Sequence, residues 1–549
     1  MTIRSQLVDL HTAEHYPVEL TIENGIIQKI ERFKKKWPNT THILPGFVDA
    51  HVHIESSMLT PTEFAKQAVI HGTVATVSDP HEIANVLGKA GVWYMIESGR
   101  RSPFKFFFGA PSCVPATDFE TSGAVITPED VAELLASDEI LYLAEVMNYP
   151  GVLANDPSVI AKLDAAKAVG KRIDGHAPGL LGQAAIDYIE HGITTDHECY
   201  TRAEGWHKLR NNMRVLVREG SAAKNFDALE SLIPKWFSQM MFCSDDKHPD
   251  DLMVGHINLL VKRAMRHLGR TQHKQYLFKI LRMACVNPVY HYNLPVGLLR
   301  VGDPADFIEV DNTYDFNILR TFIDGKVVAE NGKSLIETTP EAIVNNFNCS
   351  HKMPSDFELA LTTNEINVIE VLDGQLITNK ITARIEIING KATPSVSDDI
   401  LKIVVVNRYA DTPPAVAFIK NFGLQKGALA SSVAHDSHNI IAVGVDDASL
   451  CYAVNTIIDH KGGLVAFDGT DIGVLPLPIA GLMSPDSCET VAHNYEKLVK
   501  MAKNMGCTLT SPFMSLSFMA LLVIPSLKLS DKGLFDGSTF QFCSVETEF

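Results

Sequence analysis

Three observations predict an α/β protein built around a (β/α)₈, TIM-like barrel. The chain has 549 residues and contains eight short apolar runs, most of them followed by a helical stretch. Eight strand–helix units over about 250 residues are the size and rhythm of such a barrel. Polar residues also follow the ends of many of these runs. An open doubly wound sheet would instead gather them at one switch point and carry a glycine-rich turn after its first strand, which is missing here.

The first 45 residues are predicted to form short strands. The stretch VELTIENGIIQKIERF alternates apolar and polar positions around Glu23-Asn24-Gly25, which is a hairpin signal. A similar alternation returns within residues 296–333. We therefore expect residues 1–45 and 296–345 to complete one small composite β-sandwich domain.

The barrel is expected to span residues 46–295. Helical stretches such as PEDVAELLAS and SVIAKLDAAKAVG alternate with its strands. The eight strands are predicted at residues 47–53, 73–80, 104–112, 141–147, 172–178, 192–198, 213–220 and 239–246.

The rhythm changes after residue 345, where strand-dense segments with Gly and Pro turns begin. VDDASLCYAVNTIIDHKGGLVAF adds a helix before a further strand. Residues 346–549 are therefore expected to form a C-terminal α+β domain.

Composition excludes several classes of protein. Lys and Arg number 48 against 65 Asp and Glu, a formal charge of −17, which argues against binding to nucleic acid or to an anionic membrane. The N-terminus has no apolar signal segment, and the apolar run at 513–529 is interrupted by polar residues, so it indicates buried core. The nine cysteines include no CxxC pair. We therefore expect a cytoplasmic protein without a disulfide framework.

Six metal-ligand side chains follow the ends of the predicted strands. His51 and His53 are two apart, so period-two geometry directs both imidazoles to one face. The ends of the fourth, fifth, sixth and eighth strands add Glu145, His176, His197 and Asp245. All these ends meet at one barrel mouth. Buried carboxylates need compensation, and divalent cations would supply it. Imidazole and carboxylate ligands without thiolate suit Mn²⁺, Fe²⁺ or Zn²⁺.

Several strings resemble a known family. PGFVDAHVHIESS (45–57) resembles the amidohydrolase superfamily. More narrowly, the chain resembles the adenine deaminases in the strings DPHEIANV (79–86), EVMNYPGV (145–152), DGHAPGL (174–180), TTDHE (194–198), CSDDKHPDDL (243–252) and SSVAHDSHNIIAVGVDD (431–447).

This resemblance implies hydrolytic deamination of adenine to hypoxanthine and ammonia. It places the metal ligands at the six positions named above, favours Mn²⁺ or Fe²⁺, and implies a homo-oligomer such as a dimer. Another amidohydrolase reaction, such as cyclic amide hydrolysis, and a barrel scaffold without catalysis are the alternatives. The small zinc deaminases that act on bases carry a CxxC motif, and this chain has none. Deamination by this chain would therefore use the metal site of the barrel.

Glu145 has a particular meaning in this resemblance. Many superfamily members bridge two metal ions with a carboxylated lysine at the end of the fourth strand, and LYLAEVMN has no lysine. A glutamate carboxylate also spans two cations, so a binuclear site with Glu145 as the bridge is expected. A mononuclear site supported by Glu145 is the alternative.

The chemistry assigns further roles. A metal ion lowers the pKa of its bound water from 15.7 to about 7. Asp245 is the candidate to accept the water proton and pass it on, and Glu82 is the candidate acid for N1 of adenine. Asp79 is a candidate to contact substrate. Asp79 and Glu82 fit a helix cap and first turn equally well. Arg218 and Ser221 are candidates to contact substrate or to orient a ligand, although Ser221 also fits a helix cap.

Two further groups of polar residues stay open. Asp246 and His248 are either partners of the ligands or solvated loop residues. His435, Asp436 and His438 would either cap the mouth or bind another cation, and a hydrogen-bonded turn is the simpler interpretation.

Overall fold

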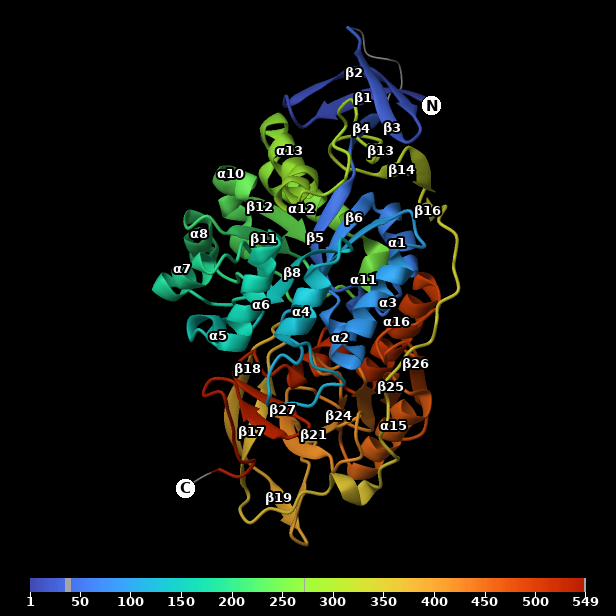
Figure 1. Ribbon diagram of the computed structural model, residues 1–549. Helices are drawn as coiled ribbons and strands as arrows, with labels where there is room; N and C mark the ends of the chain where they lie inside the picture. The colour runs from blue at the N-terminus through green and yellow to red at the C-terminus, as the bar shows by residue number, and fades with distance from the viewer. Residues whose placement is uncertain (35–40, 271, 548–549) are drawn as a thin grey trace.

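The computed structural model describes residues 1–34, 41–270 and 272–547. Three parts are stacked along the long axis of the molecule (Figure 1). A β-sheet that contains the N-terminus lies at one end, the barrel lies in the middle, and a C-terminal α+β region lies at the other end. No helix of the described part is long and apolar enough to cross a membrane.

The first sheet joins strands from before and after the barrel. β4 pairs parallel with β1 and antiparallel with β13, so it links the two groups. Asn24 and Gly25 have φ of 50° and 80°, the left-handed pair that a two-residue hairpin between β2 and β3 requires. In sheet order, the strands are β16 (Lys333–Ser334), β15 (Lys326–Glu330), β14 (Ile318–Ile323), β13 (Phe307–Val310), β4 (His42–Pro45), β1 (Thr2–Asp9), β2 (Glu14–Glu23) and β3 (Ile26–Arg32).

Eight parallel strands form the barrel, one at each predicted position. Five of them pair in the order β5 to β9, and three pair in the order β10 to β12. Their bounds are β5 (Phe47–Val52), β6 (Thr73–Ser78), β7 (Lys105–Ala110), β8 (Ile140–Val146), β9 (Arg172–Gly175), β10 (Thr195–Asp196), β11 (Arg214–Arg218) and β12 (Met240–Cys243).

Two sets of backbone contacts connect these groups of strands. Thr194 N donates to Ile173 O at 2.9 Å between β10 and β9. Asp245 N donates to His51 O at 2.9 Å after β12, next to a parallel bridge between Val52 and Asp245. The strands therefore curl into a TIM-like barrel, as predicted.

Helices surround the strands, as Figure 1 shows. The predicted helical stretches PEDVAELLAS and SVIAKLDAAKAVG become α4 and α6, and both begin with Pro at the first helical position, where its missing N–H costs nothing. The helices are α1 (Pro61–Ile70), α2 (His81–Leu87), α3 (Lys89–Gly99), α4 (Pro128–Leu135), α5 (Tyr149–Leu153), α6 (Pro157–Ala168), α7 (Gly182–Glu190), α8 (Arg202–Arg210), α9 (Phe226–Leu229), α10 (Ile233–Trp236), α11 (Pro249–Val254), α12 (Ile257–Leu268), α13 (His273–Leu281) and α14 (Asn287–Tyr292).

The C-terminal region is built on a second eight-stranded sheet. In sheet order its strands are β18 (Thr378–Arg384), β17 (Glu365–Val371), β22 (Ala415–Lys420), β21 (Ile400–Val406), β24 (Ile440–Gly444), β23 (Ala428–Ser431), β25 (Gly463–Phe467) and β26 (Ile472–Pro476). Smaller sheets add β19 (Glu386–Ile388), β20 (Lys391–Thr393), β27 (Leu527–Ser530), β28 (Gly533–Asp536) and β29 (Gln541–Phe542). Its helices are α15 (Asp447–His460), α16 (Cys488–Asn504) and α17 (Pro512–Ser517).

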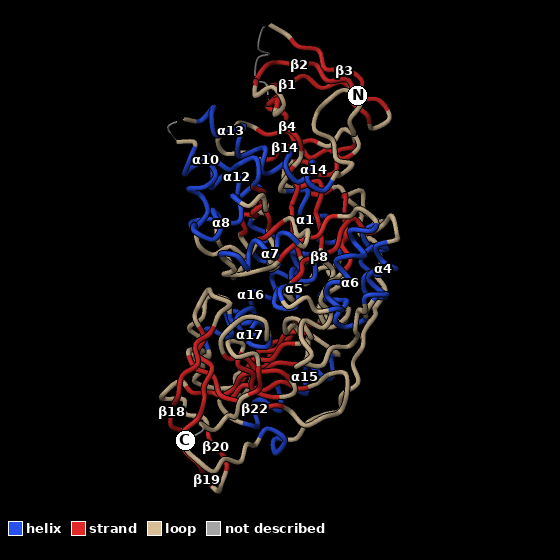
Figure 2. The backbone as a smooth tube through the Cα atoms, turned by 60° about the vertical axis from the view of Figure 1, so that its left-hand side comes forward, coloured by secondary structure: helices blue, strands red, loops and turns tan. Residues whose placement is uncertain are grey.

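The C-terminal region packs against the barrel end from which the strand termini emerge. α16 and α17 lie on the barrel side of the second sheet (Figure 2). Ser484 N donates to Met58 O at 2.9 Å, and the Tyr495 hydroxyl lies 2.8 Å from His248 Nδ1. The polar residues at the strand ends are therefore covered by the C-terminal region.

Candidate metal centre and active site

His51 and His53 stand side by side at the end of β5. Both are buried, and their Nε2 atoms lie 3.2 Å apart. His53 Nδ1 donates to the carbonyl oxygen of Asp79 at 3.1 Å. That bond fixes the tautomer, so Nε2 of His53 presents a lone pair to the site, as second-shell bonds do for metal-binding histidines.

Asp245 follows β12, which lies next to β5 in the barrel, and its side chain contacts both histidines. Its backbone is left-handed, with φ of 54°, which costs roughly 1–3 kcal/mol for a residue other than glycine. Its Oδ1 lies 3.4 Å from His51 Nε2 and 3.1 Å from His53 Nε2. Asp245 thus combines a strained backbone with side-chain contacts to both histidines at the barrel mouth.

Glu145, on β8, faces a different group of histidines with each of its oxygens. Oε1 lies 3.1 Å from His53 Nε2. Oε2 lies 2.7 Å from His176 Nδ1 and 3.2 Å from His197 Nε2. One carboxylate therefore stands between two histidine pairs, since His51 Nε2 is also 3.8 Å from Oε1.

Gly175, directly before His176, lets β9 approach β10 closely. A Cβ on Gly175 would lie 2.5 Å from the carbonyl oxygen of Thr195, so a side chain there would force β9 and β10 apart. The N–H of His176 donates to the Tyr188 hydroxyl at 3.1 Å, which anchors the turn.

Five of the six predicted ligand side chains make contacts with the spacing expected around a divalent cation, whereas His176 Nδ1 lies 2.7 Å from Glu145 Oε2, a hydrogen-bond distance. Two atoms that each lie about 2.1 Å from one ion, at angles of roughly 90–110°, are about 3.0–3.4 Å apart. The contacts of His53 Nε2 with Glu145 and with Asp245, both 3.1 Å, lie in this range, as does the 3.2 Å contact of His197. Nε2 of buried His176 lacks a hydrogen-bond partner, so its bonding is concentrated at Nδ1.

Charge balance also favours ligation. Burial alone would raise the pKa of Glu145, but the imidazoles of His176 and His197 lower it well below its usual range. Burial would likewise raise the pKa of Asp245, and Arg218 together with His51 and His53 lowers it. Both carboxylates are therefore ionised and available as ligands.

Arg218 contacts the predicted ligand Asp245 and is therefore part of the cluster. Its Nη1 lies 2.7 Å from Asp245 Oδ2, and its Nη2 donates to Glu198 Oε2 at 3.1 Å. Glu198, which the sequence analysis missed, also lies 3.5 Å from His197 Nε2 and 3.6 Å from His176 Nδ1. Arg218 and Glu198 therefore form a buried pair along one side of the ligand group.

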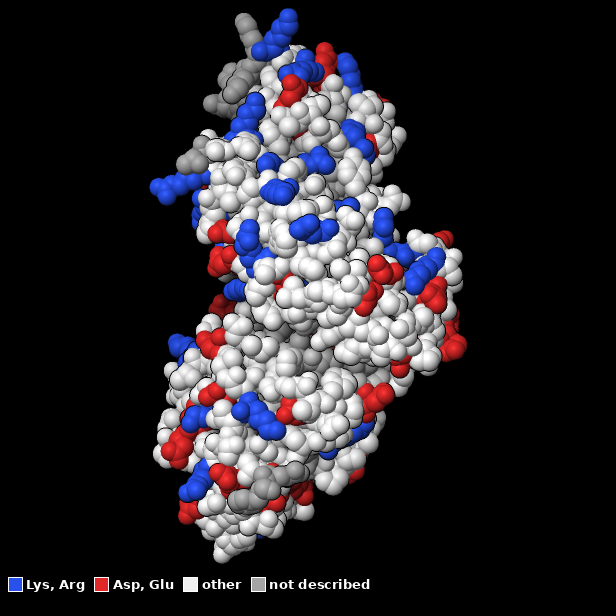
Figure 3. Space-filling model, turned by 90° about the vertical axis from the view of Figure 1, so that its left-hand side faces the viewer, with Lys and Arg blue, Asp and Glu red and all other residues white. Residues whose placement is uncertain are grey.

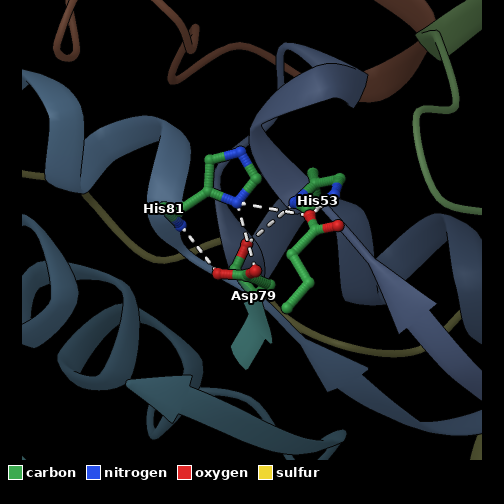
Figure 4. A group of neighbouring side chains, drawn as sticks. His53, Asp79 and His81 are labelled. Atoms are coloured by element: carbon green, nitrogen blue, oxygen red, sulfur yellow. Dashed lines mark hydrogen bonds and ion pairs between the residues drawn. The ribbon is translucent and has the colours of Figure 1, made fainter. Parts of the chain in front are cut away.

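Asp79 and His81 lie beside His53, at the start of α2 (Figure 4). The N–H of His81 donates to Asp79 Oδ1 at 3.0 Å, and His81 Nδ1 lies 3.1 Å from Asp79 Oδ2. The same nitrogen is 3.5 Å from Glu145 Oε1. Asp79 thus holds the first turn of α2 while its carbonyl orients His53. His81 was also missed from the sequence.

Glu82 meets the C-terminal region instead of the ligand group. Its Oε1 accepts from His435 Nδ1 at 2.6 Å, and its Oε2 is bonded to His438 Nε2. Burial would raise the pKa of Glu82, but His435, His438 and His81 lower it well below its usual range. His81 Nε2 lies 3.6 Å from Glu82 Oε1, and its Nδ1 faces Glu145, so His81 stands between these two carboxylates.

Ser221 and His248 anchor a loop. Ser221 Oγ donates to Asp251 Oδ2 at 2.5 Å and accepts from the N–H of His248 at 2.9 Å. Asp246 is half-buried and accepts a hydrogen bond from Ser56 Oγ at 2.5 Å. These contacts connect the Ser221 side chain to the start of α11, close to the end of β12 that is followed by Asp245.

A cavity of about 910 Å³ opens beside the end of β8. It is lined by residues of the loop after β7, by α5 and α6, and by residues between 523 and 540, and it includes Val146 and Met147, which directly follow Glu145. Figure 3 shows both kinds of charged side chain on one face and a hollow between the barrel and the C-terminal region. A volume of this size suits a small-molecule site.

Comparison with known proteins identifies the family of this chain. The amidohydrolase family model matches residues 42–328, and the model described as adenine deaminase C-terminal domain matches residues 375–541. A protein named adenine deaminase from Sulfurovum sp. (strain NBC37-1) is 55% identical over 544 residues, which cover 99% of each chain. Proteins of the same name from Salinibacter ruber (50% identical, 98% of each chain) and Methanosarcina acetivorans (48% identical, 99% of each chain) are similar over nearly their full lengths. The chain belongs to the amidohydrolase family and, within it, to the adenine deaminases.

Proposed function

We propose that the chain hydrolyses the exocyclic amino group of adenine, giving hypoxanthine and ammonia. The observation that carries this proposal is Glu145, whose two oxygens each face a separate group of imidazoles. Adenine is proposed as the substrate because the relatives that are similar over nearly the whole chain are named adenine deaminase.

The metal centre is proposed to be binuclear, with Glu145 as the shared ligand and Mn²⁺ or Fe²⁺ as the ions. One ion would be held by His51, His53, Asp245 and Oε1 of Glu145, and the other by His176, His197 and Oε2. Zn²⁺ also suits these donors. A mononuclear site is the alternative. When bound, such an ion supplies a water whose pKa is lowered from 15.7 to about 7.

The side chains then move the protons. Asp245 accepts one water proton and passes it to the departing amino group, which leaves as ammonia. Glu82 gives a proton to N1 as C6 is attacked, and the hydroxyl proton on C6 returns to Glu82 when the carbonyl of hypoxanthine forms. Arg218 holds Asp245 in place, since Nη1 lies 2.7 Å from Oδ2. A substrate contact of Asp79, Arg218 or Ser221 stays a prediction.

The remaining assignments complete the proposal. We take residues 1–45 with 296–345 as a composite β-sandwich domain, 46–295 as the barrel and 346–549 as the C-terminal domain. The enzyme is proposed to act as a homodimer in the cytoplasm, where its nine cysteines stay reduced, and all nine are free. The formal charge of −17 argues against nucleic acid as a partner.

Ammonia release and the ultraviolet change on mixing adenine with Mn²⁺- or Fe²⁺-loaded enzyme test the function. We expect turnover by the wild-type enzyme and loss of turnover with retained metal in Asp245→Asn. A cyclic amide serves as the rival substrate. No adenine turnover alongside hydrolysis of the cyclic amide would overturn the proposal in favour of a different amidohydrolase reaction.

A further inference from the structure

A turn of the C-terminal region is built into the mouth of the barrel. Residues 434–439 are buried, and Glu82 is bonded to His438 across 356 residues of sequence. Glu82 and His435 are 2% and 3% exposed, and His438 is fully buried. Both oxygens of the proposed N1 acid are therefore contacted by side chains from outside the barrel.

The hydrogen bonds of His438 fix where its proton lies. The N–H of Ala434 donates to His438 Nδ1 at 3.2 Å, so Nδ1 carries a lone pair. The proton of the neutral ring must then be on Nε2, which donates to Glu82 Oε2. A cation at Nε2 would require a doubly deprotonated ring. Glu82, His435 and His438 therefore form a hydrogen-bonded cluster and not another cation site.

His435 holds the other oxygen of Glu82. Its Nδ1 lies 2.6 Å from Oε1, and its ring stacks on Phe518 with centroids 4.5 Å apart and planes 15° apart. A carboxylate that accepts two N–H bonds is favoured in its ionised form. Glu82 in this setting does not keep the proton that N1 needs, so that proton must rest on a neighbour.

We propose that His435 stores the proton that Glu82 delivers to N1, and that His438 is a positioning residue that keeps the second oxygen of Glu82 in place. This inference rests on the proposed deamination. The proton moves from His435 Nδ1 to Glu82 Oε1 as Glu82 protonates N1. The hydroxyl proton on C6 later returns through Glu82 to His435, so no proton is gained from or lost to solvent.

The charges around His435 favour storage of a proton. Burial lowers the pKa of His435, but the carboxylates of Glu82, Asp246 and Asp436 together outweigh burial and raise the pKa to about 9. The titratable groups that face His435 come from α2, from the segment between β12 and α11, and from its own turn: Glu82, Asp246, His248, Asp436 and His438. Three of the five are acids, and burial lowers the pKa of His248 to about 3 and that of His438 to about 4, so both stay neutral.

Substitutions that keep the hydrogen bond but remove titration test the proposal. In His435→Asn, the side-chain amide replaces the Nδ1 donor and cannot store a proton. We expect kcat to fall about 100-fold, within the usual range for general acid catalysis. We expect KM to change less than about twofold. The high-pH limb of kcat, where activity is lost as the store deprotonates, should move to lower pH. His351→Asn, at an exposed histidine of the same region, is the matched control.

His438 is tested by rescue. His438→Gln keeps a donor near the Nε2 position and should be at least about tenfold more active than His438→Ala, with equal metal content in both variants. Equal activity of these two variants would overturn the positioning role. An unchanged kcat and high-pH limb in His435→Asn would overturn proton storage.

Two further observations separate the possible failures. If His435→Asn does not fold, ¹⁵N-histidine NMR of the wild-type enzyme decides, because a neutral His435 ring at pH 7.5 contradicts storage. Absence of adenine turnover in the wild-type enzyme would instead contradict the proposed function itself.

Discussion

Replacing Glu145 by Gln changes one oxygen of the proposed shared ligand into an amide nitrogen. Gln keeps the size of the side chain and one oxygen donor, but an NH₂ group cannot ligate a cation. Since Oε1 faces His53 and Oε2 faces His176 and His197, one of the two ligand groups loses its carboxylate oxygen whichever way the amide turns.

The size of the effect follows from comparison with weaker changes. Removing a hydrogen-bonding partner behind a metal ligand typically costs 10–100-fold in metal affinity. Loss of a direct anionic ligand should exceed that, so we expect at least a 100-fold loss for one ion, or about 2.8 kcal/mol. Metal content should fall from about two ions per chain to about one, and adenine turnover should fall with it.

Metal analysis by mass spectrometry after gel filtration, with titration of Mn²⁺ into the metal-free protein, measures both quantities. Glu139→Gln, an exposed position just before β8, is the matched control because it removes the same charge. Glu145→Gln that binds as much metal as the wild-type protein, with equal affinity, would refute the shared-ligand geometry.

Three other outcomes are expected. Lys208→Met should lower the free energy of unfolding by about 3–5 kcal/mol, because the buried Nζ lies 2.7 Å from Asp196 and 2.8 Å from Glu204 and both acids would lose their cation; urea unfolding, with the exposed Lys167→Met as control, measures this, and equal losses in both variants would contradict it. Burial lowers the pKa of His71 to about 4, so between pH 6.5 and 4 the unfolded chain binds a proton that the folded chain does not, and stability should fall by about 3 kcal/mol as pH falls through this window. In His71→Gln this part of the pH dependence of unfolding should disappear, and an unchanged slope would contradict the assignment. Removal of metal by a chelator should lower the unfolding temperature, since an ion at 100 times its Kd adds about 2.7 kcal/mol, and Mn²⁺ should restore it; an unfolding temperature that is the same with and without metal would argue against a bound ion.

The eight barrel strands were predictable because each is a short apolar run with polar residues at its end. His81 and Glu198 were missed although both stand directly beside predicted residues. Alternation along a strand directs neighbouring side chains to opposite faces, so His197 and Glu198 were not expected to face the same site. β10 ends at Asp196, and beyond it the chain turns, so alternation no longer applies.

The contacts of Glu82 illustrate a different limit. The clustering of His435, Asp436 and His438 was visible in the sequence, and a hydrogen-bonded turn was one of the expected interpretations. Its partner Glu82 lies 356 residues from His438, and no local periodicity connects positions so far apart. Only the docking of the C-terminal region on the barrel brings them together.

The bond between Glu82 and His438 also sets an order of events during synthesis. Domains generally fold as they emerge, beginning with the N-terminal one. The barrel strands end at Cys243, long before His438 leaves the ribosome. A newly made barrel therefore carries Glu82 without its two imidazole partners, and the mouth takes its final form only after most of the chain has been translated.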